Sequence, residues 1–567
     1  MIFNWTRSSD GLYMLFFFDS FSVNQMMFVS TGNPLKTSTF ENALLQPIPS
    51  EGHLWVPKSL HAVQWPGPTS PLHEFVHAAI QSTAGVSIDF SDALSSVPLR
   101  MDTCDDGCHV LDLSLGPTRS FKDVGCQSAA LIYEAIGIRG RTVVATSGDT
   151  GSAAAHAFSA RGLPITVLTP HGKVSPYQSN QMIAESGAIV VSVDGDFDAC
   201  QAHVKRAISD HGFISCNSIS LARLLPQIGY FAWMASRCPG MTVVVPSGNF
   251  GNATSAFMAQ KMGSPIGKVV IASNRNDAGV RYLLGQDDEY TPKPTVQNLS
   301  TAMDVGDPSN FVRLCYYLSS RDDVGAISVH DGALVRKAMV RWKCCPHTAV
   351  AHAARSLLHI PETACCVVRT AATEKFLPGV SADYVPMATN VPGLLRPFRN
   401  VVLVGMPGSG KSTCASLLDS TTDTDKEIEK RCGGVPLCDV ISKRTVAEFL
   451  ELEGAVATDV VLSGTHRVIA TGGSVVYSEQ FCNTVRRESI VIWLDAPVDV
   501  LASRIGSTWN ARGIVARDTS ITTVAELYRE RFPLYSRTSH VRVNTSEWSP
   551  SRIYEFVHQF VRNAQCC

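Results

Sequence analysis

The sequence predicts an α/β protein with more than one domain, built on parallel β-sheets. Its 567 residues exceed what one hydrophobic core usually holds, so two or three domains are expected. From about Thr142, short apolar runs alternate with glycine-rich loops and with segments of helical spacing. These runs are apolar throughout, which is typical of parallel strands buried on both faces.

Six such runs form a first unit, and the strands expected there are Thr142–Ala145, Ile165–Leu168, Ile189–Val193, Thr242–Val245, Val269–Ala272 and Cys365–Val368. A second α/β unit opens at Val401–Val404. The stretch Phe376–Pro397 between the units carries four prolines and little periodicity, which indicates a linker. We therefore expect an extension at residues 1–27, a first domain at 28–380, a linker at 381–399 and a second domain at 400–567.

Composition and charge narrow the class of function. With 45% hydrophobic and 17% charged residues, the chain fits a globular enzyme. A net charge of −2 gives no electrostatic footprint for nucleic acid or a membrane, so small molecules are the expected partners. The sequence carries no signal for an oligomeric state. Its 17 cysteines show neither CxxC pairs nor zinc-ligand spacing, which favours free thiols in a reducing, cytoplasmic setting.

The extension at residues 1–27 has no assigned role. Its apolar stretch Leu12–Phe18 is far shorter than the roughly 20 residues that span a bilayer. Both Met26 and Met27 are possible start residues.

Three segments that follow expected strands in the first unit carry chemistry. LGPTRSFKDVG contains Lys122 beside Phe121, ATSGDTG ends at Gly151, and VPSGNFGN precedes the expected helix Ala253–Met262. A lysine forms a Schiff base when it is deprotonated and held against a carbonyl. Backbone N–H groups in a small-residue run, together with a helix N-terminus, bind a phosphate dianion. The combination predicts a pyridoxal-phosphate site.

The first unit resembles threonine synthase from about Phe28 to Gly379. The motifs that carry the resemblance are VSTGNPLKTSTFENALL, LGPTRSFKDVG, ATSGDTGSAAAHAF, HGKVSPYQSNQM, GDFDACQAHVKRA, NSISLARLLPQIGYF, VPSGNFGN, ASNRND, LSTAMDVGDPSNF, PHTAVAHAA and TAATEKF. The resemblance implies the two-subdomain fold type II of pyridoxal-phosphate enzymes, which is shared with the tryptophan synthase β subunit.

The resemblance also implies roles for individual residues. Lys122 is expected to carry the cofactor and then to move protons at the substrate, and the Thr370 hydroxyl to lie by the pyridine nitrogen. The residues implied to bind the cofactor phosphate are Ser247, Gly248, Asn249, Phe250 and Gly251. Those implied to hold the amino-acid substrate are Thr146, Ser147, Asp149 and Thr150, with Lys173, Ser175 and Gln178 in the neighbouring motif.

The implied reaction converts O-phospho-L-homoserine and water to L-threonine and phosphate. An alternative is a phospholyase that releases 2-oxobutyrate, since both reactions use the same lysine and the same phosphate site. One departure from the family stands in TAATEKF, where Ala372 and Thr373 replace the usual His-Pro. Substrate closure or specificity can differ at that point.

The second unit opens with a complete Walker A sequence, VLVGMPGSGKST, between an expected strand and helix. Its glycine backbone can cradle phosphates, its lysine offsets their charge, and its serine can ligate Mg²⁺. We therefore expect ATP and Mg²⁺ as cofactors here. The expected ATP-binding residues are Gly405, Gly408, Ser409, Gly410, Lys411, Ser412 and Thr413.

From Asn400 to about Val561 the chain resembles shikimate kinase. DTDKEIEKRCGG implies that Asp423, with Ser412, lies near the metal, and that Asp425 binds the acceptor hydroxyl. ATGGSVV and RERFPLY imply Gly472, Gly473 and Arg531 at the acceptor. The chain departs from the family at three points. In FLELEG, Leu450 replaces a second carboxylate-binding arginine, and in ATGGSVV, Ser474 replaces a third glycine. The lid segment reads ARGIVARD, in which Arg512 or Arg517 can reach a phosphate.

FLELEG and the RGIV form are similar to the kinase-like domain of animal threonine-synthase-like proteins, with the domain order reversed here. Three hypotheses for this domain stay open at the level of sequence. It can phosphorylate shikimate with weakened affinity, it can phosphorylate homoserine and so supply the first domain, or it can be a degenerate kinase fold that senses a nucleotide or has a structural role.

Overall fold

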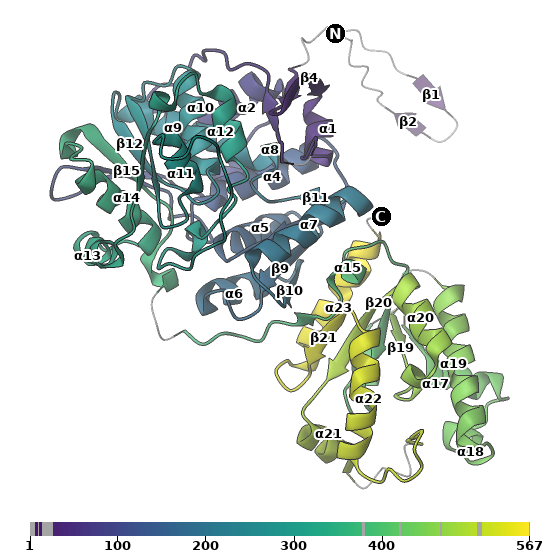
Figure 1. The fold of residues 1–567 in the computed structure, drawn as a ribbon. Helices are drawn as coiled ribbons and strands as arrows, with labels where there is room; N and C mark the ends of the chain where they lie inside the picture. Colours follow the sequence, from purple (N-terminus) through teal and green to yellow (C-terminus); the bar gives the residue numbers. More distant parts are fainter. Residues whose placement is uncertain are drawn as a thin grey trace.

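In the computed structural model, described for residues 6–8, 11–13, 26–50, 52–376, 380–418, 421–464, 468–506 and 513–565, two α/β units follow one another along the chain (Figure 1). Most of residues 1–27, and Gly379 at the end of the first resemblance, lie outside the described residues. The hairpin strands β1 (Thr6–Ser8) and β2 (Gly11–Tyr13) pair antiparallel.

The first unit contains a six-stranded sheet of its own. Its order is β14-β13-β12-β15-β7-β6, and every pairing is parallel except that of β6 with β7. The strands are β6 (Arg100–Thr103), β7 (His109–Asp112), β12 (Thr242–Pro246), β13 (Lys268–Ser273), β14 (Gly325–Ser328) and β15 (Cys365–Arg369). A small antiparallel sheet precedes it, made of β3 (Phe28–Ser30), β4 (Asn33–Ser38) and β5 (Trp55–Pro57).

A second sheet has ten strands and runs through both units, in the order β11-β8-β9-β10-β16-β21-β20-β17-β19-β18. The first unit supplies β8 (Thr142–Ala145), β9 (Ile165–Pro170), β10 (Ala188–Val193) and β11 (Ile214–Ser215). The second unit supplies β17 (Asn400–Val404), β18 (Thr421–Asp423), β19 (Val468–Ala470), β20 (Ser489–Asp495) and β21 (Val541–Asn544). The strands expected from apolar runs all form, with bounds shifted by no more than two residues.

The linker differs from the expectation, because it contains a strand. β16 (Met387–Ala388) pairs parallel with β10 and antiparallel with β21, and so joins the two halves of the ten-stranded sheet. A short helix, α15 (Val391–Leu394), follows it. Two residues in a proline-rich stretch carry no periodic signal, and the strand forms only because two sheet edges lie on either side of it.

Side chains also pack across the junction of the two units. Helix α23 (Pro550–Gln565) packs on both β10 and β17, and one hydrophobic core cluster contains residues of both units. The Gln559 amide donates to the Ser186 carbonyl at 2.6 Å, and the Arg141 guanidinium donates to the Arg396 carbonyl at 2.7 Å. The two units therefore share packing as well as a sheet.

Helices cover both sheets. Those of the first unit are α1 (Phe40–Leu45), α2 (Leu72–Ala84), α3 (Ser91–Leu94), α4 (Lys122–Ala135), α5 (Asp149–Ala160), α6 (Pro176–Ile183), α7 (Phe197–His211), α8 (Leu221–Leu224), α9 (Pro226–Arg237), α10 (Gly251–Lys261), α11 (Ala278–Leu283), α12 (Phe311–Tyr317), α13 (Gly332–Trp342) and α14 (Pro346–Leu357). Short 3₁₀ turns lie at Thr301–Met303, Arg321–Asp323, Glu362–Ala364 and Thr373–Phe376.

The second unit adds α16 (Lys411–Ala415), α17 (Thr424–Arg431), α18 (Leu437–Ser442), α19 (Val446–Ser463), α20 (Glu479–Glu488), α21 (Val498–Ile505), α22 (Val524–Thr538) and a 3₁₀ turn at Val475–Tyr477. Helix α19 starts with a capping box, in which Thr445 and Glu448 each accept from the other's backbone N–H and so satisfy two free donors. No helix of the described ranges has the length and apolarity needed to cross a bilayer.

Candidate functional sites

The first site is a cavity of about 110 Å³ beyond the carboxyl ends of β8, β12 and β15. Loops from both sheets line it, as expected for a parallel α/β protein. The predicted residues that it brings together are Lys122, Thr146, Ser147, Asp149, Thr150, Ser247, Gly248, Asn249, Phe250, Gly251 and Thr370.

Lys122 is the first residue of α4 and points into this cavity. The turn before it is tied to the loop after β15, because the Phe121 N–H donates to the Thr370 carbonyl at 2.8 Å and the Ala372 N–H donates to the Arg119 carbonyl at 3.0 Å. Burial lowers the pKa of Lys122, and the nearby Arg223 and Lys375 lower it further, although Asp149 opposes them. The amine is thereby biased toward the neutral form that reacts with an aldehyde.

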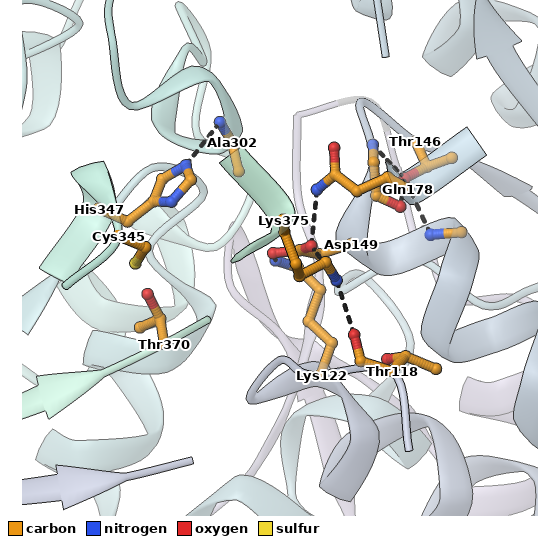
Figure 2. Close-up of polar contacts among 12 residues, drawn as sticks. Thr118, Lys122, Thr146, Asp149, Gln178, Ala302, Cys345, His347, Thr370 and Lys375 are labelled. Atoms are coloured by element: carbon orange, nitrogen blue, oxygen red, sulfur yellow. Dashed lines mark hydrogen bonds and ion pairs between the residues drawn. The ribbon is translucent and has the colours of Figure 1, made fainter. Parts of the chain in front are cut away.

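Asp149 lies at the centre of a buried charge cluster (Figure 2). One carboxylate oxygen, Oδ1, pairs with the Lys375 ammonium at 2.6 Å and accepts from the Gln178 amide at 2.6 Å. The other oxygen, Oδ2, lies 3.8 Å from Lys122 Nζ. Burial alone would raise the pKa of Asp149, but the ammonium groups of Lys375 and Lys122 hold it well below its ordinary value. Asp149 therefore stays ionised between two amines.

Lys375 is a further residue of this cluster, and the sequence motifs do not predict it. Its side chain is fully buried, and its ammonium also donates to the Thr118 carbonyl at 2.7 Å. A fully buried lysine is rare unless paired, so its position is set by Asp149. The only signal for Lys375 in the sequence is its place in the motif TAATEKF. Residue spacing alone does not connect that motif with Asp149.

The run Ser247–Gly251 joins β12 to α10 and forms the predicted phosphate cup. A Cβ on Gly248 would lie 2.6 Å from the Met303 Cα and 3.0 Å from the Ala302 carbonyl oxygen, so only glycine fits there. Gly251 is less constrained, since the first atom that its Cβ would meet is 3.3 Å away on the Asn310 side chain. Phe250, with φ of 59°, has the left-handed backbone conformation in this run, whereas Gly248 and Gly251 do not.

Two further groups suit a cofactor ring with a pyridine nitrogen. The Thr370 hydroxyl is buried and has no hydrogen-bond partner in the described part of the chain. His347 accepts from the Ala302 N–H at 3.0 Å, and burial lowers the pKa of His347 to about 4, so the imidazole is neutral (Figure 2). An orphaned hydroxyl, a glycine cradle and a helix N-terminus together fit pyridoxal phosphate.

The residues expected to hold the amino-acid substrate fall into two groups. Thr146 Oγ1 accepts from the N–H groups of Gly148 and Gly151, both at 2.9 Å, and so shapes the loop around the cavity. Lys173, Ser175 and Gln178 do not line the cavity, and Lys173 is exposed. Ser175 caps α6 and donates to Gln178, which in turn reaches Asp149. The motif containing these three residues thus acts on the site through Asp149.

The second site is a cavity of about 640 Å³ at the carboxyl end of β17, and all predicted ATP-binding residues from Gly408 to Thr413 line it. Gly405, Gly408 and Gly410 have φ of 150°, 79° and 96°, values that few other residues adopt. Lys411 Nζ donates to the Gly405 carbonyl at 2.7 Å, and burial lowers the pKa of Lys411 to about 8. The loop therefore forms a nest, in which successive backbone N–H groups can bind a phosphate.

The metal and acceptor residues lie beside this loop. Ser412 lines the cavity, whereas the Asp423 side chain caps α17 by accepting from the Asp425 N–H at 2.9 Å. The described residues contain no group of three or more His, Cys, Asp or Glu side chains that could hold a metal ion. The acceptor residues that line the cavity are Asp425, Gly472, Gly473 and Arg531.

Two other features of this cavity matter. Glu453, which the motif FLELEG contains but does not mark as a site residue, lines the cavity and is 1% exposed. Leu450 packs against the core cluster of the second unit and is not part of the lining. Arg512 lies outside the described residues, and Arg517 is exposed and donates to the Tyr477 carbonyl at 2.9 Å.

Comparisons with known proteins match both halves of the chain. A family model described as pyridoxal-phosphate dependent enzyme matches residues 100–370, and one described as shikimate kinase matches residues 407–562. The threonine synthase of Escherichia coli K12 is 43% identical over 234 residues, and that of Pseudomonas aeruginosa is 33% identical over 342 residues, 54% of this chain and 72% of that protein. Both predicted resemblances are confirmed.

The solved structures agree. The crystal structure of threonine synthase from Escherichia coli shares 30% sequence identity with this chain, covers 62% of it and 89% of its own chain, and has a TM-score of 0.54. The predicted fold class is confirmed by this match together with the two family models. The matched sequence spans 53% of the length of the Escherichia coli protein and 65% of that of Haemophilus influenzae.

Proposed function

Because the chain belongs to the threonine synthase family, we propose that its first domain, residues 28–380, converts O-phospho-L-homoserine and water to L-threonine and phosphate. The observation that carries this proposal is the partly buried Lys122 facing a glycine cradle at the N-terminus of α10. Bound pyridoxal phosphate supplies an electron sink that stabilises negative charge at the substrate Cα.

The chain's own residues perform the remaining tasks. Lys122 holds the cofactor and moves the proton at the substrate Cα, for which a depressed lysine pKa suits neutral pH. Gly248 and Asn249 offer backbone N–H groups that orient the cofactor phosphate, whereas the Ser247 N–H already donates to the Ala272 carbonyl. Thr146 shapes the loop that would hold the amino acid, and the buried Asp149 keeps Lys122 in place.

The identity of the product distinguishes threonine synthesis from the phospholyase reaction at this site. The purified chain is incubated with O-phosphohomoserine and pyridoxal phosphate, and the products are followed by proton NMR and by phosphate release. Threonine formed in equal amount to phosphate supports the proposal. Phosphate release with 2-oxobutyrate and no threonine would contradict it in favour of a phospholyase.

We propose further that the second domain, residues 400–567, transfers phosphate from ATP, with Mg²⁺, to a small hydroxy acid of the shikimate or homoserine type. The observation that carries this proposal is one cavity that holds both the phosphate loop and the acceptor residues Asp425 and Arg531. Lys411 is placed to offset phosphate charge, and Ser412 to ligate the metal.

ADP release in the presence of each acceptor tests this activity. Lys411→Ala should abolish acceptor-dependent ADP release and leave threonine formation from supplied O-phosphohomoserine unchanged, because the first site uses none of the phosphate loop. ATP binding without turnover on either acceptor would favour a nucleotide-sensing domain instead.

A further inference from the structure

Ionisable side chains surround one glycine loop at the acceptor end of the second cavity. A Cβ on Gly472 would overlap the Glu453 carboxyl group and lie 2.8 Å from Asp425 Oδ1, so both carboxyl groups border this glycine. A Cβ on Gly473 would lie 2.9 Å from Arg531 Nη1. Two carboxyl groups and one guanidinium therefore face the same small space, and all three residues line the cavity.

Two of these groups have unused hydrogen-bonding capacity. Arg531 is 1% exposed, and its other nitrogens donate to the Tyr477 hydroxyl and the Val515 carbonyl, but Nη1 has no partner among the described residues. Glu453 is equally buried, and its Oε2 has no partner within the same part of the chain. Buried polar atoms without partners are costly, so a ligand that satisfies both atoms gains affinity.

Leu450 stands where the resemblance implies a second arginine, so this position brings no cation to Glu453, and the cations that act on Glu453 are Arg531 and Lys411. Leu450 lies three residues before Glu453 on α19, so the two share one helix face. Leucine at this position packs against the core cluster and brings no charge. Burial and the neighbouring Asp425 raise the pKa of Glu453 to about 8. A cation bound beside Glu453 therefore stabilises its ionised form.

We propose that the acceptor of the second domain is a small hydroxy amino acid bound as its zwitterion, with the carboxylate on Arg531, the ammonium on Glu453 and the hydroxyl on Asp425. This inference rests on the proposed kinase function. The ammonium supplies a cation beside Glu453, and an acceptor without an amine leaves Glu453 Oε2 buried without a partner among the described residues.

The transfer step balances with ATP as the phosphate donor. The acceptor hydroxyl oxygen forms a bond to the γ-phosphorus, and the bond from that phosphorus to the β–γ bridging oxygen breaks. ADP leaves with the electron pair, and the hydroxyl proton passes to Asp425. The product is a phosphate monoester of a hydroxy amino acid, which is the class of substrate proposed for the first domain.

The test compares acceptors that differ by one group. The full chain is incubated with Mg-ATP and L-homoserine, with 4-hydroxybutyrate, which lacks only the amine, or with shikimate. ADP release and ³¹P NMR of the products give kcat/KM for each. We expect homoserine to exceed 4-hydroxybutyrate by about a hundredfold, because a buried charged partner is lost. Shikimate turned over as well as homoserine, or better, would overturn the proposal while upholding the kinase activity.

Variants separate recognition of the amine from general damage. Glu453→Gln should lower kcat/KM for homoserine by about a hundredfold and change that for 4-hydroxybutyrate little. Glu451→Gln, an exposed position two residues earlier on the same helix, is the matched control. Leu450→Arg returns a cation beside Glu453 and should weaken homoserine while strengthening shikimate. Equal losses for both homoserine and 4-hydroxybutyrate in Glu453→Gln would overturn the assignment.

If no acceptor is phosphorylated although Mg-ATP binds, the kinase activity fails, and binding alone then tests the zwitterion site. Calorimetry with L-homoserine in the presence of a non-hydrolysable ATP analogue should show binding that Glu453→Gln abolishes. Absence of that binding, or binding that does not depend on Glu453, would overturn the site as well.

Discussion

The two cavities of this chain are built on the same plan and differ in how their charges are paired. Each places a lysine and a glycine-rich loop at the carboxyl end of a parallel strand. In the first cavity, Asp149 already pairs with Lys375, Gln178 and Lys122. In the second, Glu453 and Arg531 each keep one buried atom without a partner in the described residues.

This difference indicates what each set of charges is for. A fully paired cluster produces a fixed electrostatic field before any ligand binds, so it sets the reactivity of Lys122. An incomplete cluster is completed by the ligand, so it sets which ligand binds. Substitutions in the first cluster should therefore change pH dependence, whereas those in the second should change acceptor choice.

The largest expected effect comes from Lys122→Ala. Only a primary amine at this position can link covalently to the cofactor, so threonine formation should fall by about 10⁴-fold or more, and the absorbance of the protein-bound cofactor should be lost. Acceptor-dependent ADP release by the same protein should not change. A variant that kept both the absorbance and the threonine formation would falsify the role of Lys122.

The glycines of the phosphate cup give the next effect, because they differ in the space that they leave. Gly248→Ala forces a Cβ to within 2.6 Å of the Met303 backbone, whereas Gly251→Ala meets only a side-chain amide at 3.3 Å. The dissociation constant of pyridoxal phosphate, measured by fluorescence titration, should rise about 30-fold in the first variant and less than about threefold in the second. Equal effects in the two variants would contradict this ranking.

Lys375→Met tests whether the paired cluster controls Lys122. Without the Lys375 ammonium, the pKa of Lys122 should rise, because one of the groups that lower it is removed while Asp149 remains. The acidic limb of the pH profile for threonine formation should move to higher pH, with about a tenfold loss at pH 7. Lys375→Arg, which keeps the charge, should restore much of the activity. A loss that is equal at every pH would point to packing alone.

The sequence predicted much of the fold because apolar runs mark buried strands. β8, β12 and β17 all stand where the runs indicated them. β16 was missed, since a two-residue strand in a proline-rich stretch exists only through its neighbours β10 and β21. Local periodicity carries no information about such a strand.

The same limit applies to the sites. Lys122 and the phosphate loop were found because their motifs are local. Lys375 and Asp149 are 226 positions apart in sequence, and nothing in the motif FLELEG marks Glu453 as a residue of the cavity. Pairing of charges across a fold depends on topology, which residue spacing does not encode.

The smallest expected effect is on stability, and it sharpens the contrast between the two clusters. The pKa of Glu453 is raised by burial and by Asp425 from 4.5 to about 8, so the folded state holds a proton that the unfolded state releases. Between pH 4.5 and 8 the unfolded chain therefore binds fewer protons, and the free energy of unfolding falls as the pH rises. Above about pH 8 Glu453 is ionised in both the folded and the unfolded chain, and the loss of stability stops growing.

Glu453→Gln cannot ionise, so its Tm should exceed that of the wild type by more at pH 8 than at pH 5. The difference in Tm should widen by roughly 5 °C in differential scanning calorimetry. Glu451→Gln, on the exposed side of α19, should follow the wild type at both pH values. A gap that is constant from pH 5 to pH 8 would show that Glu453 is ionised in the folded chain, and hence that the second cluster is already paired like the first.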